Sequence, residues 1–209
     1  MSDERAKKIK MMLFDVDGVM TDGTIFLFPA PGAGAGRDTH ERREKMADQG
    51  GFGFAGQEMI EAKGFNAHDG AGFSLARLGG LKTGIITKRI SETVALRARD
   101  LKIEHVYQGQ QDKASAFYEI LAKEGLTPEQ VCYVGDDVID LPVMRKCGLA
   151  IAVNNARPEV KAEAHWATSH KGRGRGCARC RRIHPESAGE MEAGDRGIYL
   201  GKKLITRSQ

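Results

Sequence analysis

The sequence contains no apolar run approaching the roughly 20 consecutive residues that a membrane-spanning helix needs. The charged segment 1–10 leads into an apolar run at 9–14 that is too short for the core of a signal peptide. We therefore expect a cytoplasmic protein with no membrane partner. With 209 residues, 41% of them hydrophobic, the chain can form one domain of ordinary size around a buried core.

Cysteine is also scarce, with four in the whole chain. Cys132 and Cys147 lie in apolar stretches, so we expect them to be small core residues and not a disulfide. The other two, Cys177 and Cys180, form a C-x-x-C pair in the C-terminal segment. With His184 and His170 they could supply four zinc ligands, but one such pair is a weak indication of zinc.

Acidic residues are few near the C-terminus. Segment 171–209 holds ten Lys or Arg and four Asp or Glu, whereas the whole chain has a net charge of only +4. The basic character therefore belongs to the tail, and it is a poor indication that the protein as a whole binds nucleic acid. The Gly and Arg content of the tail leaves open a flexible basic arm for RNA.

Strands and helices are predicted to alternate along most of the chain. Apolar runs predict strands at 9–14, 81–87, 103–107, 131–134, 149–153 and 166–168. Helical patterns follow at 70–78, 91–101, 112–124, 137–146 and 157–164. This alternation predicts an α/β fold, a Rossmann-like doubly wound parallel sheet with helices on both faces. In such sheets ligands bind at the carboxyl ends of the strands.

The composition changes between the first strand and this regular alternation. Segment 24–28 is β-branched and aromatic, and segment 58–67 has alternating apolar and polar residues. We interpret them as the two arms of a β-hairpin flap at about 24–67. Segment 29–57 would form its long tip, which we expect to be mobile because it is rich in Gly, Pro and charge.

Polar side chains follow the ends of three predicted strands. Asp15 and Asp17 are two positions apart, so an extended backbone points them to the same side. The full set is Asp15, Asp17, Thr87, Arg89, Asp136, Asp137 and Asp140, with Lys113 at the start of helix 112–124. Acids are also common at helix starts, and this is the alternative explanation for Asp137 and Asp140.

This combination of side chains suits phosphoryl transfer. Carboxylates without a nearby His or Cys favour a hard cation, most often Mg²⁺. One carboxylate can act as the nucleophile that forms an acyl-phosphate, while a second passes a proton to the leaving alkoxide. A lysine, a threonine hydroxyl and backbone N–H groups can hold the remaining phosphate oxygens.

The ordered motifs resemble the haloacid dehalogenase-like phosphatase superfamily. They are Asp15-Val16-Asp17, then Thr87, Lys113 and Gly135-Asp136-Asp137-Val138-Ile139-Asp140. Within that superfamily, segments 15–23, 65–70 and 107–113 resemble the 3-deoxy-D-manno-octulosonate 8-phosphate phosphatases. The resemblance covers about residues 8–170, which we predict to be the phosphatase domain.

The resemblance implies a role for each acid of the metal centre. Asp15 would be the nucleophile and a Mg²⁺ ligand. Asp17 would be the general acid and base, would contact the substrate, and would give its backbone carbonyl to the metal. Asp136 would be the other protein ligand of the metal.

The resemblance also implies how the substrate is held. Thr87 and Lys113 would bind the phosphoryl group. Arg89 would bind the carboxylate or phosphate of the substrate. Asp137 and Asp140 would lie next to the metal ligands without binding the metal themselves.

The family relation implies hydrolysis of a phosphate ester on an eight-carbon sugar acid made for lipopolysaccharide. It also implies a hairpin flap in place of a large cap domain, and a homotetramer assembled through the flaps. Two other functions stay open. One is a phosphatase for another acid sugar phosphate, of the sialic acid 9-phosphate type. The other is a non-catalytic assembly module like the related domains fused to cytidylyltransferases.

The chain departs from the family in three places. Lys88 stands where the family often has glycine, the tip 29–57 is long, and the tail 171–209 replaces a terminal amphipathic helix. Shifted by one nucleotide, segment 183–191 can encode Phe-Ile-Leu-Lys-Ala-Gln-Gly-Lys-Trp, which has the helical pattern of the family. The tail is therefore interpreted as frame-shifted or disordered, as a basic arm, or as a zinc site.

Overall fold

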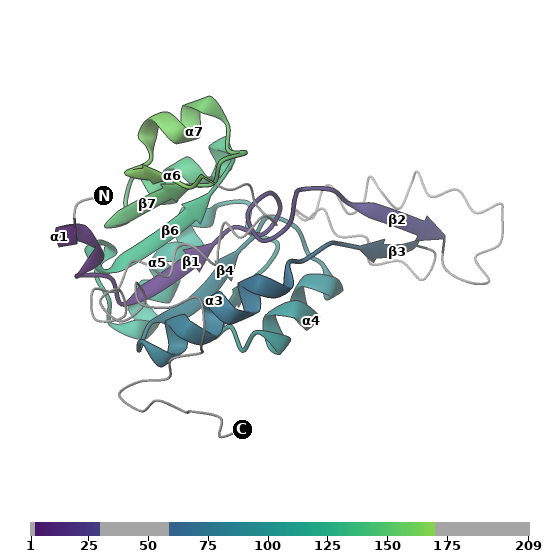
Figure 1. Cartoon of the computed structure of the whole chain (residues 1–209), viewed down its shortest axis with the longest axis horizontal. Helices are drawn as coiled ribbons and strands as arrows, with labels where there is room; N and C mark the ends of the chain where they lie inside the picture. The colour runs from purple at the N-terminus through teal and green to yellow at the C-terminus, as the bar shows by residue number, and fades with distance from the viewer. Residues whose placement is uncertain (1–2, 30–58, 170–209) are drawn as a thin grey trace, which may run out of the picture.

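A computed structural model describes residues 3–29 and 59–169 of the chain (Figure 1). Its main sheet has six parallel strands in the order β5-β4-β1-β6-β7-β8, and two further strands, β2 and β3, form a separate antiparallel pair. The predicted α/β fold with a parallel sheet is thus confirmed. The tip 30–58 and the tail from residue 170, with His170, Cys177, Cys180 and His184, lie outside the described residues.

The described strands are β1 (Met11–Phe14), β2 (Phe26–Pro29), β3 (Met59–Ala62), β4 (Lys82–Ile86), β5 (His105–Tyr107), β6 (Val131–Gly135), β7 (Leu149–Ala152) and β8 (Trp166–Ala167). The α-helices are α1 (Asp3–Ala6), α3 (Ala67–Leu78), α4 (Glu92–Asp100), α5 (Lys113–Glu124), α6 (Leu141–Met144) and α7 (Pro158–Glu163). Two short 3₁₀ helices are η1 (Pro128–Gln130) and η2 (Val138–Asp140). No helix within these described ranges is both long and apolar enough to cross a membrane.

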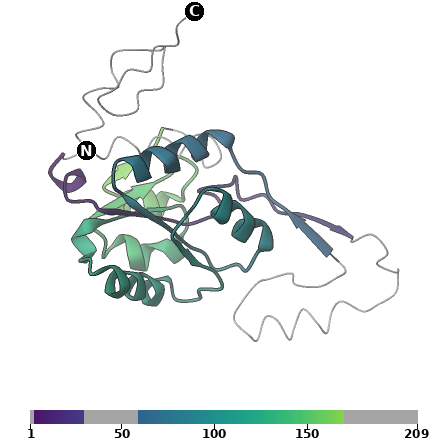
Figure 2. The same cartoon turned by 90° about the horizontal axis from the view of Figure 1, so that it is seen from below.

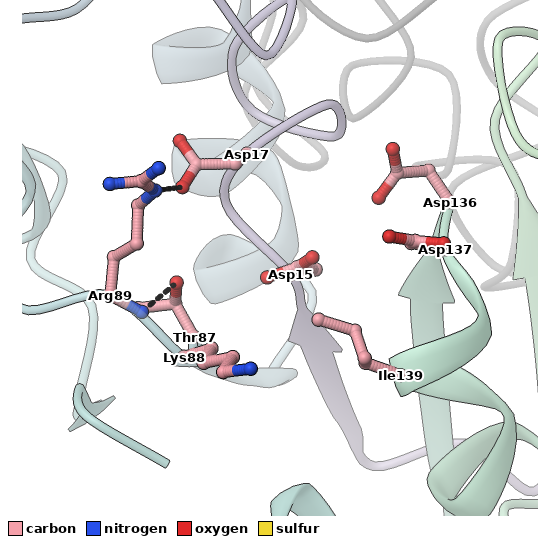
Figure 3. A pocket seen from close by; sticks show the side chains of 8 residues that line it. All are labelled: Asp15, Asp17, Thr87, Lys88, Arg89, Asp136, Asp137 and Ile139. Atoms are coloured by element: carbon pink, nitrogen blue, oxygen red, sulfur yellow. Dashed lines mark hydrogen bonds and ion pairs between the residues drawn. The ribbon is translucent and has the colours of Figure 1, made fainter. Parts of the chain in front are cut away.

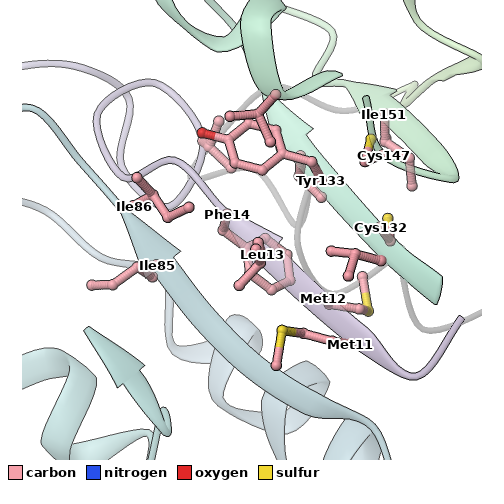
Figure 4. Close-up of a cluster of buried hydrophobic side chains, with 14 of the residues drawn as sticks. Met11, Met12, Leu13, Phe14, Ile85, Ile86, Cys132, Tyr133, Cys147 and Ile151 are labelled. Carbon is pink, nitrogen blue, oxygen red and sulfur yellow. The ribbon is translucent and has the colours of Figure 1, made fainter. Parts of the chain in front are cut away.

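Helices cover both faces of the sheet. The connections through α3 and α4 step toward β5, whereas those through α5, α6 and α7 step toward β8. Because parallel crossovers are right-handed, opposite directions place the two groups on opposite faces, as Figures 1 and 2 show. The central strand β1 is buried along its whole length, and its apolar run is continuous because both faces are covered (Figure 4).

Both cysteines of the described core match their prediction. Cys132 and Cys147 are buried free thiols among the apolar side chains of the sheet (Figure 4). Burial raises the pKa of Cys147 to about 11, so this thiol stays protonated and unreactive at neutral pH.

Side-chain caps fix where the helices begin. Ser91 and Asp112 accept hydrogen bonds from the first turns of α4 and α5, close to the predicted starts. The predicted arm 58–67 was wrong in its second half: β3 ends at Ala62, and Asn66 caps α3, which begins three residues earlier than predicted. The predicted helix 137–146 is in fact the 3₁₀ turn η2 followed by the single turn α6.

The hairpin pair extends from the carboxyl edge of the main sheet (Figure 1). Phe26 pairs with Ala62, and Phe28 pairs with Ile60. β2 therefore runs away from the edge at which β1, β4 and β6 end, and β3 returns toward it.

Candidate active site

The carboxyl ends of β1, β4 and β6 meet at one edge of the sheet. Phe14 is in register with Ile85 and Val134, and the Asp15 backbone N–H extends the ladder by donating to the Val134 carbonyl at 2.9 Å. A cavity of about 220 Å³ opens at this edge (Figure 3). It is lined by Asp15, Asp17, Thr87, Lys88, Arg89, Asp136, Asp137 and Ile139.

A buried lysine lies between two buried carboxylates beside the cavity. Lys113 Nζ is 2.8 Å from Asp15 Oδ1 and 2.7 Å from Asp140 Oδ1. Burial favours the neutral amine, but the two carboxylates outweigh it and raise the pKa of Lys113. Burial and the charge of Asp140 raise the pKa of Asp15 to about 7, although Lys113 opposes this shift.

Asp140 has its hydrogen-bonding capacity filled by protein groups. Oδ1 accepts from Lys113 and, at 2.8 Å, from the Tyr133 hydroxyl. Oδ2 accepts from the backbone N–H groups of Asp136 and Asp137 at 2.9 and 3.2 Å. A carboxylate offers about four lone-pair sites, so Asp140 holds the loop in place and has no site left for a metal.

Three carboxylates form a group that could hold a metal ion. One oxygen each from Asp15, Asp136 and Asp140 lie within 4.8 Å of one another. Asp136 Oδ1 is buried and has no hydrogen-bond partner among the described residues. Because Asp140 is saturated, Asp15 and Asp136 are the acids that fit a hard cation such as Mg²⁺.

Asp17 faces the opposite side of the cavity. Lys63 donates to its Oδ1, and Arg89 Nε lies 3.4 Å from its Oδ2. Figure 3 shows the Asp17 side chain turned toward Arg89 and away from Asp136. Any contact of Asp17 with the metal would thus come from its backbone carbonyl, which stays a prediction.

Thr87 lies buried directly after β4 and lines the cavity. Its backbone is fixed to the next strand, since its N–H donates to Tyr107 at 2.9 Å and its carbonyl accepts from Gln110 at 3.0 Å. Its Oγ1 accepts the Arg89 N–H at 3.4 Å, so the hydroxyl hydrogen can point to another acceptor. This arrangement suits a phosphate oxygen.

The structure brings all eight predicted side chains to the same edge. Asp15, Asp17, Thr87, Arg89, Asp136 and Asp137 line the cavity, whereas Lys113 and Asp140 lie beside it. Sequence reasoning missed Lys63, Tyr133 and Ile139. The sequence did offer an indication for Tyr133, because a tyrosine inside a strand that ends in acids can reach a carboxylate. It offered no such indication for Lys63, since the position of this side chain depends on how the hairpin folds.

Gly18 permits the close approach of Asp136. It has φ +88°, and a Cβ there would lie 2.0 Å from Asp136 Oδ2. We predict that Gly18→Ala displaces this carboxylate, weakens Mg²⁺ binding at least about tenfold, and costs about 1–3 kcal/mol of unfolding free energy. Calorimetric Mg²⁺ titration and urea denaturation measure the two effects.

Gly80 provides the matched control for that substitution. It has a similar φ of +76°, but nothing lies within 4 Å of a Cβ placed there. Gly80→Ala also places an alanine at a positive φ, so it should lower stability without changing the Mg²⁺ affinity. Equal Mg²⁺ affinities in the two variants would contradict the role of Gly18.

Protons and Mg²⁺ should compete for the carboxylates of Asp15 and Asp136. Burial and the surrounding carboxylates raise the pKa of Asp136 to about 8, from a usual value of 3.8. The folded state then holds more protons than the unfolded state between pH 4 and 8, so the metal-free protein loses stability as pH rises through this range. Mg²⁺ stabilises the charged form and should bind more tightly at pH 8 than at pH 6.

We therefore predict that the rise in Tm produced by Mg²⁺ is larger at pH 8 than at pH 6. At 100 times Kd the stabilisation should reach about 3 kcal/mol. Scanning calorimetry with Mg²⁺ or with a chelator measures it. Asp136→Asn should remove most of the Mg²⁺ effect, and an unchanged Tm rise in this variant would contradict the assignment.

A family model and individual relatives both match this chain, and they indicate the same kind of protein. A model of the haloacid dehalogenase-like hydrolase family matches residues 84–179. A 3-deoxy-D-manno-octulosonate 8-phosphate phosphatase of Yersinia pestis is 39% identical over 176 residues, which are 84% of this chain and 79% of that protein.

Solved structures agree in fold over a similar span. The crystal structure of the Yersinia pestis phosphatase aligns with a TM-score of 0.73 at 34% identity, covering 91% of this chain and 88% of that one. A Moraxella catarrhalis 3-deoxy-D-manno-octulosonate 8-phosphate phosphatase, solved with a magnesium ion, a phosphate ion and the sugar acid, aligns with a TM-score of 0.72 at 27% identity. That alignment covers 90% of this chain and 94% of the other.

Proposed function

The chain belongs to the 3-deoxy-D-manno-octulosonate 8-phosphate phosphatase family of haloacid dehalogenase-like hydrolases, and we propose that it hydrolyses this phosphate ester to the free sugar acid and phosphate. The observation that carries the proposal is the buried Asp15 carboxylate, 2.8 Å from Lys113 and grouped with Asp136 at the edge of the cavity. A nucleophile, a balancing cation and a place for a metal thus occur together.

The first step transfers the phosphoryl group to Asp15. The described contacts of this carboxylate fall on Oδ1, which leaves Oδ2 as the attacking oxygen. As the bond from Oδ2 to phosphorus forms, the bond from phosphorus to the sugar oxygen breaks. The leaving alkoxide takes its proton from the carboxyl of Asp17, and Thr87 and Lys113 hold the phosphoryl oxygens.

The second step releases phosphate. A water molecule gives one proton to the Asp17 carboxylate and attacks phosphorus. The bond from phosphorus to Asp15 then breaks, which restores the Asp15 carboxylate and leaves Asp17 protonated for the next turnover. Asp15, Asp136 and the backbone carbonyl of Asp17 would hold Mg²⁺, whose charge offsets that of the phosphate dianion.

Phosphate release from a panel of esters tests the proposal. With Mg²⁺ present, kcat/KM for 3-deoxy-D-manno-octulosonate 8-phosphate should exceed that for glucose 6-phosphate, which lacks the carboxylate, at least about 100-fold. Sialic acid 9-phosphate tests the nearest alternative substrate. A preference for sialic acid 9-phosphate would overturn the substrate assignment. If no ester released phosphate, the assignment as an enzyme would be overturned, and a non-catalytic assembly module would be favoured.

The proposal includes a cytoplasmic homotetramer that forms through the hairpins. Phe26, Phe28 and Ile60 on this hairpin are each about half exposed. An isolated two-stranded hairpin is marginally stable in water, so packing against a second copy would stabilise it. The mass of the protein in solution measures the assembly, and Phe28→Ser should shift it toward smaller species.

A further inference from the structure

Lys63 lies at the root of the hairpin, directly after β3, and its side chain is completely buried. The buried ammonium donates to Asp17 Oδ1. Burying a lysine is costly unless the charge is paired, so the fold holds this side chain in place through Asp17.

Both oxygens of the Asp17 carboxylate are engaged by cations. Lys63, on the hairpin, contacts Oδ1. Arg89, which follows β4, places its Nε 3.4 Å from Oδ2. The Arg89 side chain is 29% exposed and that of Lys63 is 0% exposed. Since water weakens exposed ion pairs, the Lys63 contact is the stronger constraint on the direction in which Asp17 points.

Lys63 is anchored in turn to the start of α4. Glu61 Oε1 lies 3.9 Å from Lys63 Nζ and accepts a hydrogen bond from the Ser91 hydroxyl. The Glu61 carbonyl accepts from Thr93 Oγ1 at 3.2 Å. The root of the hairpin is thus tied to the body of the protein at both its backbone and its side chains.

We infer that Lys63 is a positioning residue, which orients the Asp17 carboxyl for proton transfer to the leaving sugar oxygen and links the hairpin root to this step. The inference rests on the proposed function and on the role of Asp17 in it. Lys63 itself touches neither substrate nor metal in this role.

Two substrates with different leaving groups test the inference. A sugar alkoxide needs a proton as it leaves, whereas the nitrophenolate of p-nitrophenyl phosphate does not. In single-turnover measurements, Lys63→Met should slow transfer from the sugar phosphate at least about 30-fold but transfer from p-nitrophenyl phosphate less than about threefold. Lys63→Arg, which keeps the charge, should recover most of the loss. The steady-state KM of both variants should be nearly unchanged.

Matched variants make the outcome decisive. Lys82→Met removes a lysine that pairs with Glu124, away from the cavity, and should leave both rates unchanged. If Lys63→Met fails to fold, Glu61→Gln removes only its anchor and should slow the sugar phosphate selectively to a smaller extent.

The possible results separate the two proposals. The role of Lys63 would be overturned if a variant with a native Tm were slowed equally on both esters or on neither. The proposed phosphatase function would remain. A wild-type protein that releases phosphate from neither ester would overturn the proposed function and the inference with it.

Discussion

Asp15→Asn should reduce kcat for phosphate release at least about 1,000-fold, because an amide cannot form the acyl-phosphate. The fold should survive the change. Lys113 keeps Asp140 as its partner at 2.7 Å, and the loss of one negative charge relieves repulsion among the buried acids. Phosphate release and Tm, measured at pH 8 on the same preparation, test both statements.

Asp100→Asn is a suitable control for Asp15→Asn. Asp100 is an exposed acid at the end of α4 that pairs with Arg97, and its loss should leave kcat within about twofold of wild type. A phosphorylated wild-type protein that forms on mixing with substrate and is absent in Asp15→Asn would identify the nucleophile. Activity of Asp15→Asn near that of the wild type would contradict the mechanism.

Lys113→Met should destabilise the protein by about 3–5 kcal/mol at pH 8 and abolish activity. Methionine fills a similar volume but leaves the carboxylates of Asp15 and Asp140 buried without their cation. The pKa of Asp15, already raised to about 7, should rise further in the variant. Below that value Asp15 is protonated and uncharged, so the destabilisation should be smaller at pH 5.5 than at pH 8.

Urea denaturation at the two pH values measures this effect. The double variant Lys113→Met with Asp15→Asn should regain part of the lost stability, because it removes one of the two uncompensated charges. Lys123→Met, which breaks an exposed pair with Glu119, should leave the stability nearly unchanged at either pH. A loss in Lys113→Met that does not depend on pH would contradict the charge-based explanation.

The sequence was sufficient to predict the edge at which the acids gather. Asp15, Thr87 and Asp136 each follow a short apolar strand, and parallel strands bring their carboxyl ends together. The order of the strands along the chain and the fixed hand of the crossovers are enough to bring these residues to one edge, and no side-chain contact is required.

Side-chain contacts were the part that the sequence left open. Asp140 was predicted behind the metal centre, but its saturation by four donors depends on the tight turn at η2 and on Gly135, where a Cβ would lie 2.7 Å from Asp140. The contact between Lys63 and Asp17 spans 46 positions and depends on how the hairpin leaves the sheet. Local patterns carry no information about such distances.

The antiparallel pairing of β2 with β3 has a consequence for chain length. Residues Phe26 and Ala62 are already neighbours at the root, so the geometry there is set before the chain reaches residues 30–58. The free energy of closing a loop grows only with the logarithm of its length, by about 0.6 kcal/mol for each doubling. Insertions beyond Pro29 can therefore accumulate over evolutionary time at small energetic cost, without moving Asp17 or the strand ends.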